Sequence, residues 1–241
     1  MTLFEALTAA RQKIDRLDAR LLLQYATGCS HTDLLARPET PVSAPAYAQF
    51  AEWVERRAAG EPLAYLVGEA EFRGRIFQVS PAVLIPRPET EVLIDLARAK
   101  LQGMTAPKVL DLGTGSGIVA ISLALECPQA AVVAVDLAKE AISVARNNAG
   151  RLGVRIDLRA GDWFAPLGDE RFDLIVSNPP YVAEGDPHLD LDGLPFEPRM
   201  ALTAGADGLA CIRHIVAAAV AHLNPGGWLL FEHGYDQGTA C

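Results

Sequence analysis

Long apolar runs, paired cysteines and an apolar leader are all missing from this sequence of 241 residues. Its best candidate for a membrane span, residues 215–221, is far shorter than the roughly 18 apolar residues that such a helix needs. The first twenty residues carry seven scattered charged side chains, which is incompatible with the core of a signal peptide. The four cysteines are far apart and favour neither a disulfide framework nor a zinc knuckle. We therefore expect a cytoplasmic protein that does not enter membranes.

Basic charge is scarce in the second half of the chain. Residues 101–241 hold nine Lys and Arg against 17 Asp and Glu, a net charge of −8, whereas residues 1–100 are close to neutral. Tight binding to nucleic acid requires clustered basic groups that neutralise phosphates, so direct nucleic-acid contact is not expected there. The five histidines have no metal-ligand spacing, and no metal site is predicted.

The remaining composition is that of an ordinary globular protein, and its patterns divide the chain into three parts. Apolar residues recur at helical spacing between Leu3 and Gly68, which predicts a small helical domain over residues 1–70. Residues 71–104 are expected to form a hairpin around a glycine turn and then a linker helix. Strands and helices alternate over residues 105–241, which predicts an α/β domain with a doubly wound, mostly parallel sheet.

A glycine-rich turn follows the first strand of this alternation, at the carboxyl edge where such sheets bind ligands. The turn reads Gly113-Thr114-Gly115-Ser116-Gly117 and opens a helix. Glycines without Cβ atoms let the backbone touch a ligand. Ile118 stands where the dinucleotide fingerprint has its third glycine, which favours S-adenosylmethionine over NAD. The alternative is a tight turn without a ligand.

Polar residues also follow the next two strands. Asp136 ends the second strand, at the position from which a carboxylate accepts the hydrogen bonds of a ribose diol. Asp162 and Trp163 follow the third strand and offer a carboxylate for an adenine amino group and an aromatic face. Each alone is typical of a surface acid or a core aromatic residue. Together at one edge, they favour a bound nucleotide-like cofactor.

The fourth strand ends in Asn178-Pro179-Pro180-Tyr181, the most specific pattern in the chain. Two prolines fix the backbone and remove two N–H donors, so the Asn178 side-chain oxygen and the Pro179 carbonyl can both accept hydrogen bonds from a planar NH₂ group. Such acceptors would favour the geometry that frees the nitrogen lone pair for attack, and Tyr181 would stack on the planar group. The alternative is a proline-rich loop with a buried tyrosine.

The Asn-Pro-Pro-Tyr sequence resembles the motif of amino-group methyltransferases. Segments 72–79 and 84–91 are similar to the protein-glutamine N5-methyltransferases known as HemK or PrmC, and segments 196–202 and 231–234 are similar to later blocks of that family. The resemblance implies a class I, Rossmann-like methyltransferase domain over residues 105–241, and the helical leader matches the family's N-terminal domain. Because every ligand-type residue falls after residue 80, residues 1–70 are expected to recognise the protein partner. The resemblance also implies that S-adenosyl-L-methionine donates a methyl group to the glutamine in the Gly-Gly-Gln loop of class I peptide chain release factors, and that S-adenosyl-L-homocysteine is the product.

The expected site combines this resemblance with the residue patterns above. Catalysis is assigned to Asn178, Pro179 and Tyr181, and the substrate glutamine to residues 178–181. The expected cofactor contacts are Gly113, Thr114, Gly115, Ser116, Gly117, Asp136, Asp162, Trp163 and Asn178. Three other functions stay open: methylation of a glutamine in a ribosomal protein, methylation of adenine N6 in nucleic acid, and binding without catalysis.

The sequence departs from the family at its C-terminal end. The family's sheet is completed by an antiparallel pair of strands, whereas this chain stops at Cys241, nine residues beyond Glu232. We expect these strands to be truncated, which would leave an apolar strand edge uncovered. Self-association through that edge is expected.

Overall fold

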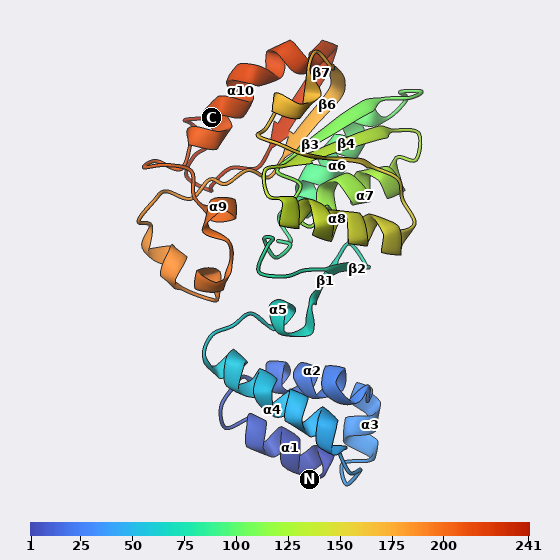
Figure 1. Cartoon of the computed structure of the whole chain (residues 1–241), viewed down its shortest axis with the longest axis vertical. Helices are drawn as coiled ribbons and strands as arrows, with labels where there is room; N and C mark the ends of the chain where they lie inside the picture. The colour runs from blue at the N-terminus through green and yellow to red at the C-terminus, as the bar shows by residue number, and fades with distance from the viewer. The chain divides into compact units, whose positions relative to one another are not determined.

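The computed structural model describes all residues from 1 to 241 and divides into two compact units, Met1–Gly68 and Glu69–Cys241 (Figure 1). No helix in either unit is at once long enough and apolar enough to cross a membrane. The two units are described separately.

The first unit consists of five helices, four of which begin at a short polar side chain that caps them. Thr2 accepts a hydrogen bond from the Glu5 N–H and Glu5 returns one to Thr2, a capping box. Gly28, with φ at +70°, ends the second helix in the left-handed conformation that glycine adopts without strain. The helices bury Leu22 and Phe50 in a core of their own, so the predicted helical domain is confirmed. They are α1 (Leu3–Ala10), α2 (Arg16–Thr27), α3 (His31–Ala36), α4 (Ala44–Ala58) and α5 (Leu63–Val67).

The second unit begins with an antiparallel hairpin, β1 (Glu69–Phe72) and β2 (Arg75–Gln78), followed by α6 (Thr90–Leu101). The hairpin is fastened to the rest of the unit by polar contacts. Gln78 exchanges two backbone hydrogen bonds with the Asn148 side chain, and Arg73 forms a two-pronged ion pair with Glu126.

A five-stranded sheet of order β5-β4-β3-β6-β7 forms the centre of this unit, and all neighbouring strands are parallel. The order reverses between β3 and β6, which is the point where open sheets of this kind bind ligands. The predicted doubly wound sheet is confirmed. Its strands are β3 (Lys108–Leu112), β4 (Ala131–Asp136), β5 (Asp157–Ala160), β6 (Phe172–Ser177) and β7 (Leu223–Phe231).

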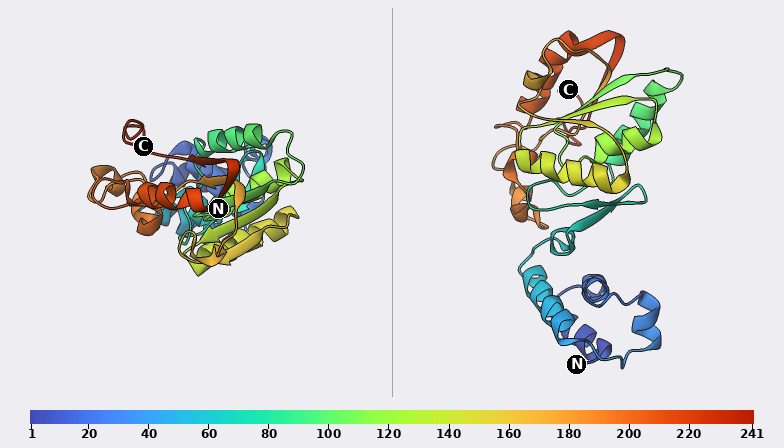
Figure 2. Two further views of the ribbon diagram at one scale, coloured as in Figure 1. Left: turned by 90° about the horizontal axis from the view of Figure 1, so that it is seen from above. Right: turned by 45° about the vertical axis from the view of Figure 1, so that its right-hand side comes forward.

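Alternate strand residues face two separate cores. Val109 and Leu174 pack with the helices α6, α7 (Ile118–Glu126) and α8 (Lys139–Leu152) on one face. Leu110 and Ile175 pack on the other face with α10 (Ala210–His222) and the short turn η1 (Ala165–Leu167). Because both faces are covered, the strands are apolar throughout, and Figure 2 shows the helices on either side of the sheet.

Two features of this unit differ from the sequence expectation or add to it. The strand expected over 228–232 begins earlier, at Leu223, because Leu223 already pairs with Phe172 before a bulge shifts the register. Between β6 and α10 the chain forms short elements that the strand and helix patterns do not reveal: η2 (Pro187–Asp190), η3 (Leu194–Phe196) and α9 (Arg199–Leu202).

The strand β7 pairs only with β6, so its other side is an edge of the sheet. Trp228 on this strand is 46% exposed, and the ammonium of Lys100 lies 3.3 Å from the centre of its ring. Open edges of this kind invite pairing with another chain.

We expect the protein to self-associate through β7. Sedimentation velocity over a range of concentrations should show dimers or larger species, and Trp228→Glu should shift them towards monomer because a charge on an edge strand opposes pairing. Leu35→Glu changes an even more exposed apolar residue in the first unit and should leave the distribution unchanged. A wild-type chain that stays monomeric at every concentration would contradict this expectation.

Candidate functional site

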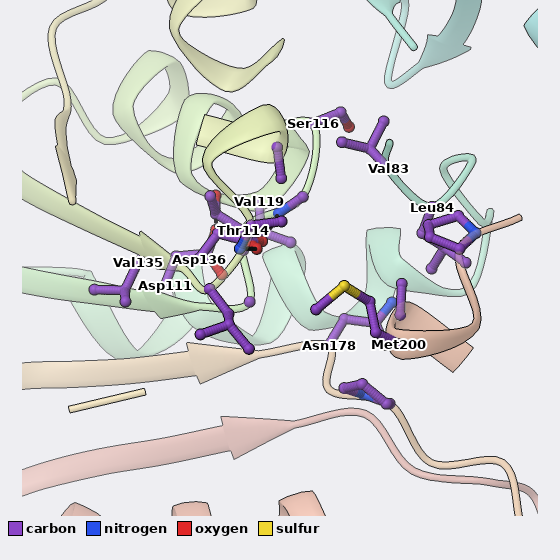
Figure 3. Close-up of a pocket in the computed structure, with 18 of the residues that line it drawn as sticks. Val83, Leu84, Asp111, Thr114, Ser116, Val119, Val135, Asp136, Asn178 and Met200 are labelled. Atoms are coloured by element: carbon purple, nitrogen blue, oxygen red, sulfur yellow. Dashed lines mark hydrogen bonds between the residues drawn. The ribbon is translucent and has the colours of Figure 1, made fainter. Parts of the chain in front are cut away.

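The carboxyl ends of β3, β4 and β6 open into one cavity of about 300 Å³ in the second unit (Figure 3). Most of the residues predicted as a site lie in its wall. Those that line it are Gly113, Thr114, Gly115, Ser116, Asp136, Asp162, Trp163, Asn178 and Pro180. Gly117, Pro179 and Tyr181 lie outside this lining, and their roles stay predictions.

The glycine-rich turn is held by its own backbone against the end of β4. The N–H groups of Gly113 and Thr114 both donate to the carbonyl of Val135, at 2.9 and 3.0 Å. Gly117 has φ at +85°, and a Cβ atom there would lie 2.9 Å from the side chain of Ile121. This glycine therefore permits the start of α7 to pack closely, which accounts for its place outside the cavity.

Asp136 is fixed in the cavity wall by two backbone donors. Its Oδ2 accepts from the Gly115 N–H at 2.8 Å and its Oδ1 from the Ala138 N–H at 2.9 Å. Burial raises the pKa of this carboxyl, and these backbone hydrogen bonds oppose the rise. Each oxygen keeps a lone pair, so the carboxylate is positioned to accept hydrogen bonds from a ligand.

Asp162 and Trp163 lie at the mouth of the same cavity, after β5. Asp162 is exposed to solvent, whereas Trp163 is half-buried and has an unusual positive φ of 43°. A Cβ atom on Gly113 would lie 3.8 Å from the indole ring, so the ring packs against the glycine-rich turn.

Asp111 is a lining residue that was not predicted as part of the site. It lies near the end of β3, is 1% exposed, and accepts hydrogen bonds from the Thr114 hydroxyl at 2.7 Å and the Ala120 N–H at 3.2 Å. Burial raises its pKa to about 7, against these two hydrogen bonds. An acid within an otherwise apolar strand, Val-Leu-Asp-Leu, is the signal in the sequence that could have identified it.

The Asn178 loop begins where β6 is fastened to β3. The Ser177 hydroxyl donates to the Leu112 carbonyl at 2.8 Å, which holds the two strand ends together. The Asn178 amide nitrogen donates to the Thr90 hydroxyl at 3.1 Å. Burial raises the pKa of Tyr181, and the nearby Glu232 carboxylate raises it further.

A second wall of the cavity comes from residues 82–87 and from Pro198, Met200 and Ala201, to which sequence analysis gave no role in the site. Glu197, only 4% exposed, ties them together. It accepts hydrogen bonds from the Ile85 N–H at 3.0 Å and from the Arg87 guanidinium at 2.5 Å. Residues 84–87 and 198–201 fall within segments that resemble the glutamine methyltransferases, and Met200 lies beside Asn178 (Figure 3).

These residues fit S-adenosylmethionine. A cavity of about 300 Å³ with mostly apolar walls and a few fixed polar groups is typical of a small-molecule site. The anchored carboxylate of Asp136 suits the ribose hydroxyls, and the backbone of the glycine-rich turn lies open beside it.

Comparison with known proteins agrees with this geometry. Residues 3–68 match the family described as PrmC N-terminal domain, and residues 89–192 match the methyltransferase small domain. The release factor glutamine methyltransferase of Bordetella pertussis is 50% identical over 100% of this chain and 89% of its own length. The protein of the same name from Vibrio cholerae is 46% identical over 100% of this chain and 87% of its own length.

A solved structure supports the fold. The 16S rRNA N2 G1207 methyltransferase from T. thermophilus aligns with a TM-score of 0.51 and 24% identity, over 67% of this chain and 40% of its own. The parallel sheet, the glycine-rich turn and the anchored Asp136 thus define a methyltransferase with a class I fold. Sequence identity of 46–50% over the whole of this chain defines the family more narrowly. The chain belongs to the release factor glutamine methyltransferase family.

The raised pKa of Asp111 predicts a stability that depends on pH. A carboxyl with a higher pKa in the folded state binds its proton more tightly there, so stability falls as the pH rises from about 4 to 7. The side chain introduced by Asp111→Asn does not ionise, so the unfolding free energy of this variant should depend less on pH over this range. Urea unfolding at pH 5 and pH 8 should show a smaller loss of unfolding free energy in the variant than in wild type. Equal losses would mean that Asp111 does not titrate in this range.

Proposed function

We propose that this chain transfers a methyl group from S-adenosylmethionine to the side-chain amide nitrogen of the glutamine in the Gly-Gly-Gln loop of class I peptide chain release factors. The observation that carries the proposal is the convergence of Asn178 with Asp136 and the glycine-rich turn on one cavity. The relatives' printed name, release factor glutamine methyltransferase, supports the choice of substrate.

Cofactor binding is assigned to the glycine-rich turn after β3 and to the residues at the ends of β4 and β5. Asp136 accepts from the ribose hydroxyls, Asp162 from the adenine amino group, and Trp163 covers the adenine ring. The residues from Gly113 to Gly117 bring backbone close to the cofactor. When bound, S-adenosylmethionine supplies a methyl group on a positively charged sulfur.

The substrate side is assigned to the Asn178 loop. The Asn178 oxygen and the Pro179 carbonyl accept the two N–H bonds of the glutamine amide, and Pro180 and Tyr181 enclose its plane. An amide nitrogen is a weak nucleophile because its lone pair is delocalised into the carbonyl. Two fixed acceptors favour the orientation in which that lone pair points at the methyl group, and positioning of this kind can lower a barrier substantially.

The transfer is a single in-line displacement. A bond forms between the amide nitrogen and the methyl carbon while the bond from that carbon to sulfur breaks, and the sulfur keeps the electron pair. The product amide, briefly protonated, releases one proton to water. S-adenosyl-L-homocysteine is the other product, and the reaction needs no metal ion and no catalytic base.

Mass spectrometry of a release factor after incubation with this enzyme and S-adenosylmethionine tests the proposal. One added methyl group is expected on the glutamine of the Gly-Gly-Gln peptide, and none on a release factor whose glutamine is changed to asparagine. Ribosomal proteins and an adenine-containing oligonucleotide serve as parallel substrates. Methylation of one of these, with the release factor unmodified, would contradict the proposal.

Residues 1–68 are proposed to recognise the release factor, since every residue assigned to the chemistry lies in the second unit. The whole reaction is placed in the cytoplasm, where release factors act on ribosomes.

Removal of residues 1–68 should separate recognition from cofactor binding. The Michaelis constant for the whole release factor should rise, because the proposed recognition surface is lost, while the affinity for S-adenosylmethionine measured by calorimetry stays the same. If the affinities for the release factor and for S-adenosylmethionine fell equally, these helices would only support the second unit.

Replacing Asp136 with alanine should weaken S-adenosylmethionine binding at least tenfold. Hydrogen bonds to a charged group contribute about 1.5–3 kcal/mol each, and two are proposed here. Calorimetry measures the effect, and Asp169→Ala, which removes an exposed acid outside the cavity, serves as the matched control. Unchanged affinity in Asp136→Ala would exclude the ribose assignment.

Asn178→Ala should lose turnover while keeping its affinity for the cofactor. Removal of one preorganised hydrogen-bonding group costs about 10²–10³ in turnover. Asn178→Asp keeps an acceptor and should retain partial activity. Asn147→Ala, an exposed asparagine on α8, should behave as wild type in the same assay. Wild-type turnover in Asn178→Ala would rule out the proposed amide clamp.

A further inference from the structure

One fully buried side chain joins two segments that lead into the cavity. Asn148 lies on α8, is 0% exposed, and was given no role by sequence analysis. Its amide is hydrogen-bonded to the backbone of Gln78, at the end of β2, and of Ser116, in the glycine-rich turn. Those two residues lie 70 and 32 positions away in the chain. A polar side chain buried this completely is expected to have a physical reason for its place.

We infer that Asn148 is a positioning residue that holds the glycine-rich turn at a fixed distance from the cavity wall of residues 82–87. Asn148 does not line the cavity itself, so it acts through the backbone of Ser116 and Gln78. This inference rests on the proposed function for the place of the wall beside the substrate. The affinity for the cofactor tests it without any methyl acceptor.

The hydrogen bonds use both N–H groups of the amide and fix the way it faces. The Gln78 N–H can only donate, so the end of Asn148 that it contacts, at 2.7 Å, is the side-chain oxygen. The two protons on the Asn148 nitrogen go to the Gln78 carbonyl at 2.9 Å and to the Ser116 carbonyl at 2.8 Å. A turned amide would lose all three hydrogen bonds. The orientation of Asn148 therefore follows from backbone groups alone.

The glycine-rich turn depends on α8 in two ways. A Cβ atom on Gly117 would lie 3.1 Å from the Cβ of Ala145, so the helix packs directly against the turn. Asn148 follows Ala145 by three positions and projects from the same face of α8. From that face it donates to the carbonyl of Ser116, a residue that is only 2% exposed. Loss of the Asn148 amide would deprive this carbonyl of its buried partner, which favours a shift of the turn.

The cavity wall depends on the same amide through β2. Gln78 is the last residue of that strand, and the wall begins shortly after it, at Ala82. The far end of the wall is fixed separately, because Glu197 accepts a hydrogen bond from the Ile85 N–H at 3.0 Å. Asn148 is therefore the attachment of the wall on the side of the glycine-rich turn.

A shared nitrogen fixes the distance between the turn and the wall. Ser116 of the turn and Val83 of the wall both line the cavity (Figure 3). Because one Asn148 nitrogen donates to both segments, Ser116 cannot move away from β2 without breaking a hydrogen bond. The space for the cofactor is thus set before the cofactor binds, which reduces the ordering that binding requires.

Calorimetry with S-adenosyl-L-homocysteine tests the inference in the full chain. Asn148→Ala should weaken binding by about tenfold or more, because the released turn can shift towards other donors and the ligand must reverse that shift. Glu126→Gln is the matched control, since it loosens the same hairpin at Arg73 without touching the cavity lining. Its dissociation constant should stay within about twofold of wild type, because distant sites act independently.

Urea unfolding of the two variants separates positioning from general support of the fold. Both should lower the free energy of unfolding, whereas only Asn148→Ala should lose affinity for S-adenosyl-L-homocysteine. Wild-type affinity in Asn148→Ala, or an equal loss of affinity in Glu126→Gln, would overturn the inference. Loss of affinity in Asn148→Ala alone, in a chain that methylates no release factor, would uphold the inference and contradict only the proposed function.

Hydrogen exchange in the wild-type chain tests the same coupling without a variant. The Gln78 N–H donates to Asn148, and Gln78 lies outside the cavity lining. S-adenosyl-L-homocysteine bound at the turn should slow the exchange of this N–H more than that of Cys127, which donates to Leu123 at the end of α7 and reports general stabilisation by the ligand. Equal slowing at both residues, or none at Gln78, would overturn the inference.

Discussion

The register of three parallel strands is the constraint on which the site depends. Leu112 at the end of β3 is paired with Val135 on one side and Ser177 on the other, so three strand ends stop at the same level. The residues that come next, Gly113, Asp136 and Asn178, are therefore neighbours in space although they are far apart in the chain. A slip of one residue in either pairing would turn the strand's side chains to the opposite core and move these three residues apart.

Buried polar groups secure this edge, and most of them are hydrogen-bonded to the backbone or to one another. Asp111 holds the glycine-rich turn, Ser177 joins two strand ends, and Glu197 ties two walls of the cavity together. Because these side chains are hydrogen-bonded, they fix the positions of the segments around the cavity at a small cost in free energy. Removal of one partner would leave a buried polar group without a hydrogen bond. The cavity is thus shaped before a ligand arrives, which reduces the ordering that binding requires.

The sequence predicts much of this arrangement and misses a defined part of it. The order of strands and helices and the residues after each strand follow from local patterns, because apolar strands and glycine turns are recognisable in short windows. Glu197 and the 82–87 wall do not, since their importance comes from contacts between residues more than a hundred positions apart. The early start of β7 at Leu223 also depends on a partner strand that no local pattern reveals.

A crystal structure with S-adenosyl-L-homocysteine and a peptide containing the Gly-Gly-Gln sequence would show directly whether the Asn178 loop holds the substrate amide beside the cofactor. We expect the homocysteine ligand between the glycine-rich turn and Asp136, with the glutamine amide nitrogen in hydrogen-bonding distance of both the Asn178 oxygen and the Pro179 carbonyl. A glutamine bound elsewhere, or bound with its amide carbonyl towards Asn178, would contradict this expectation.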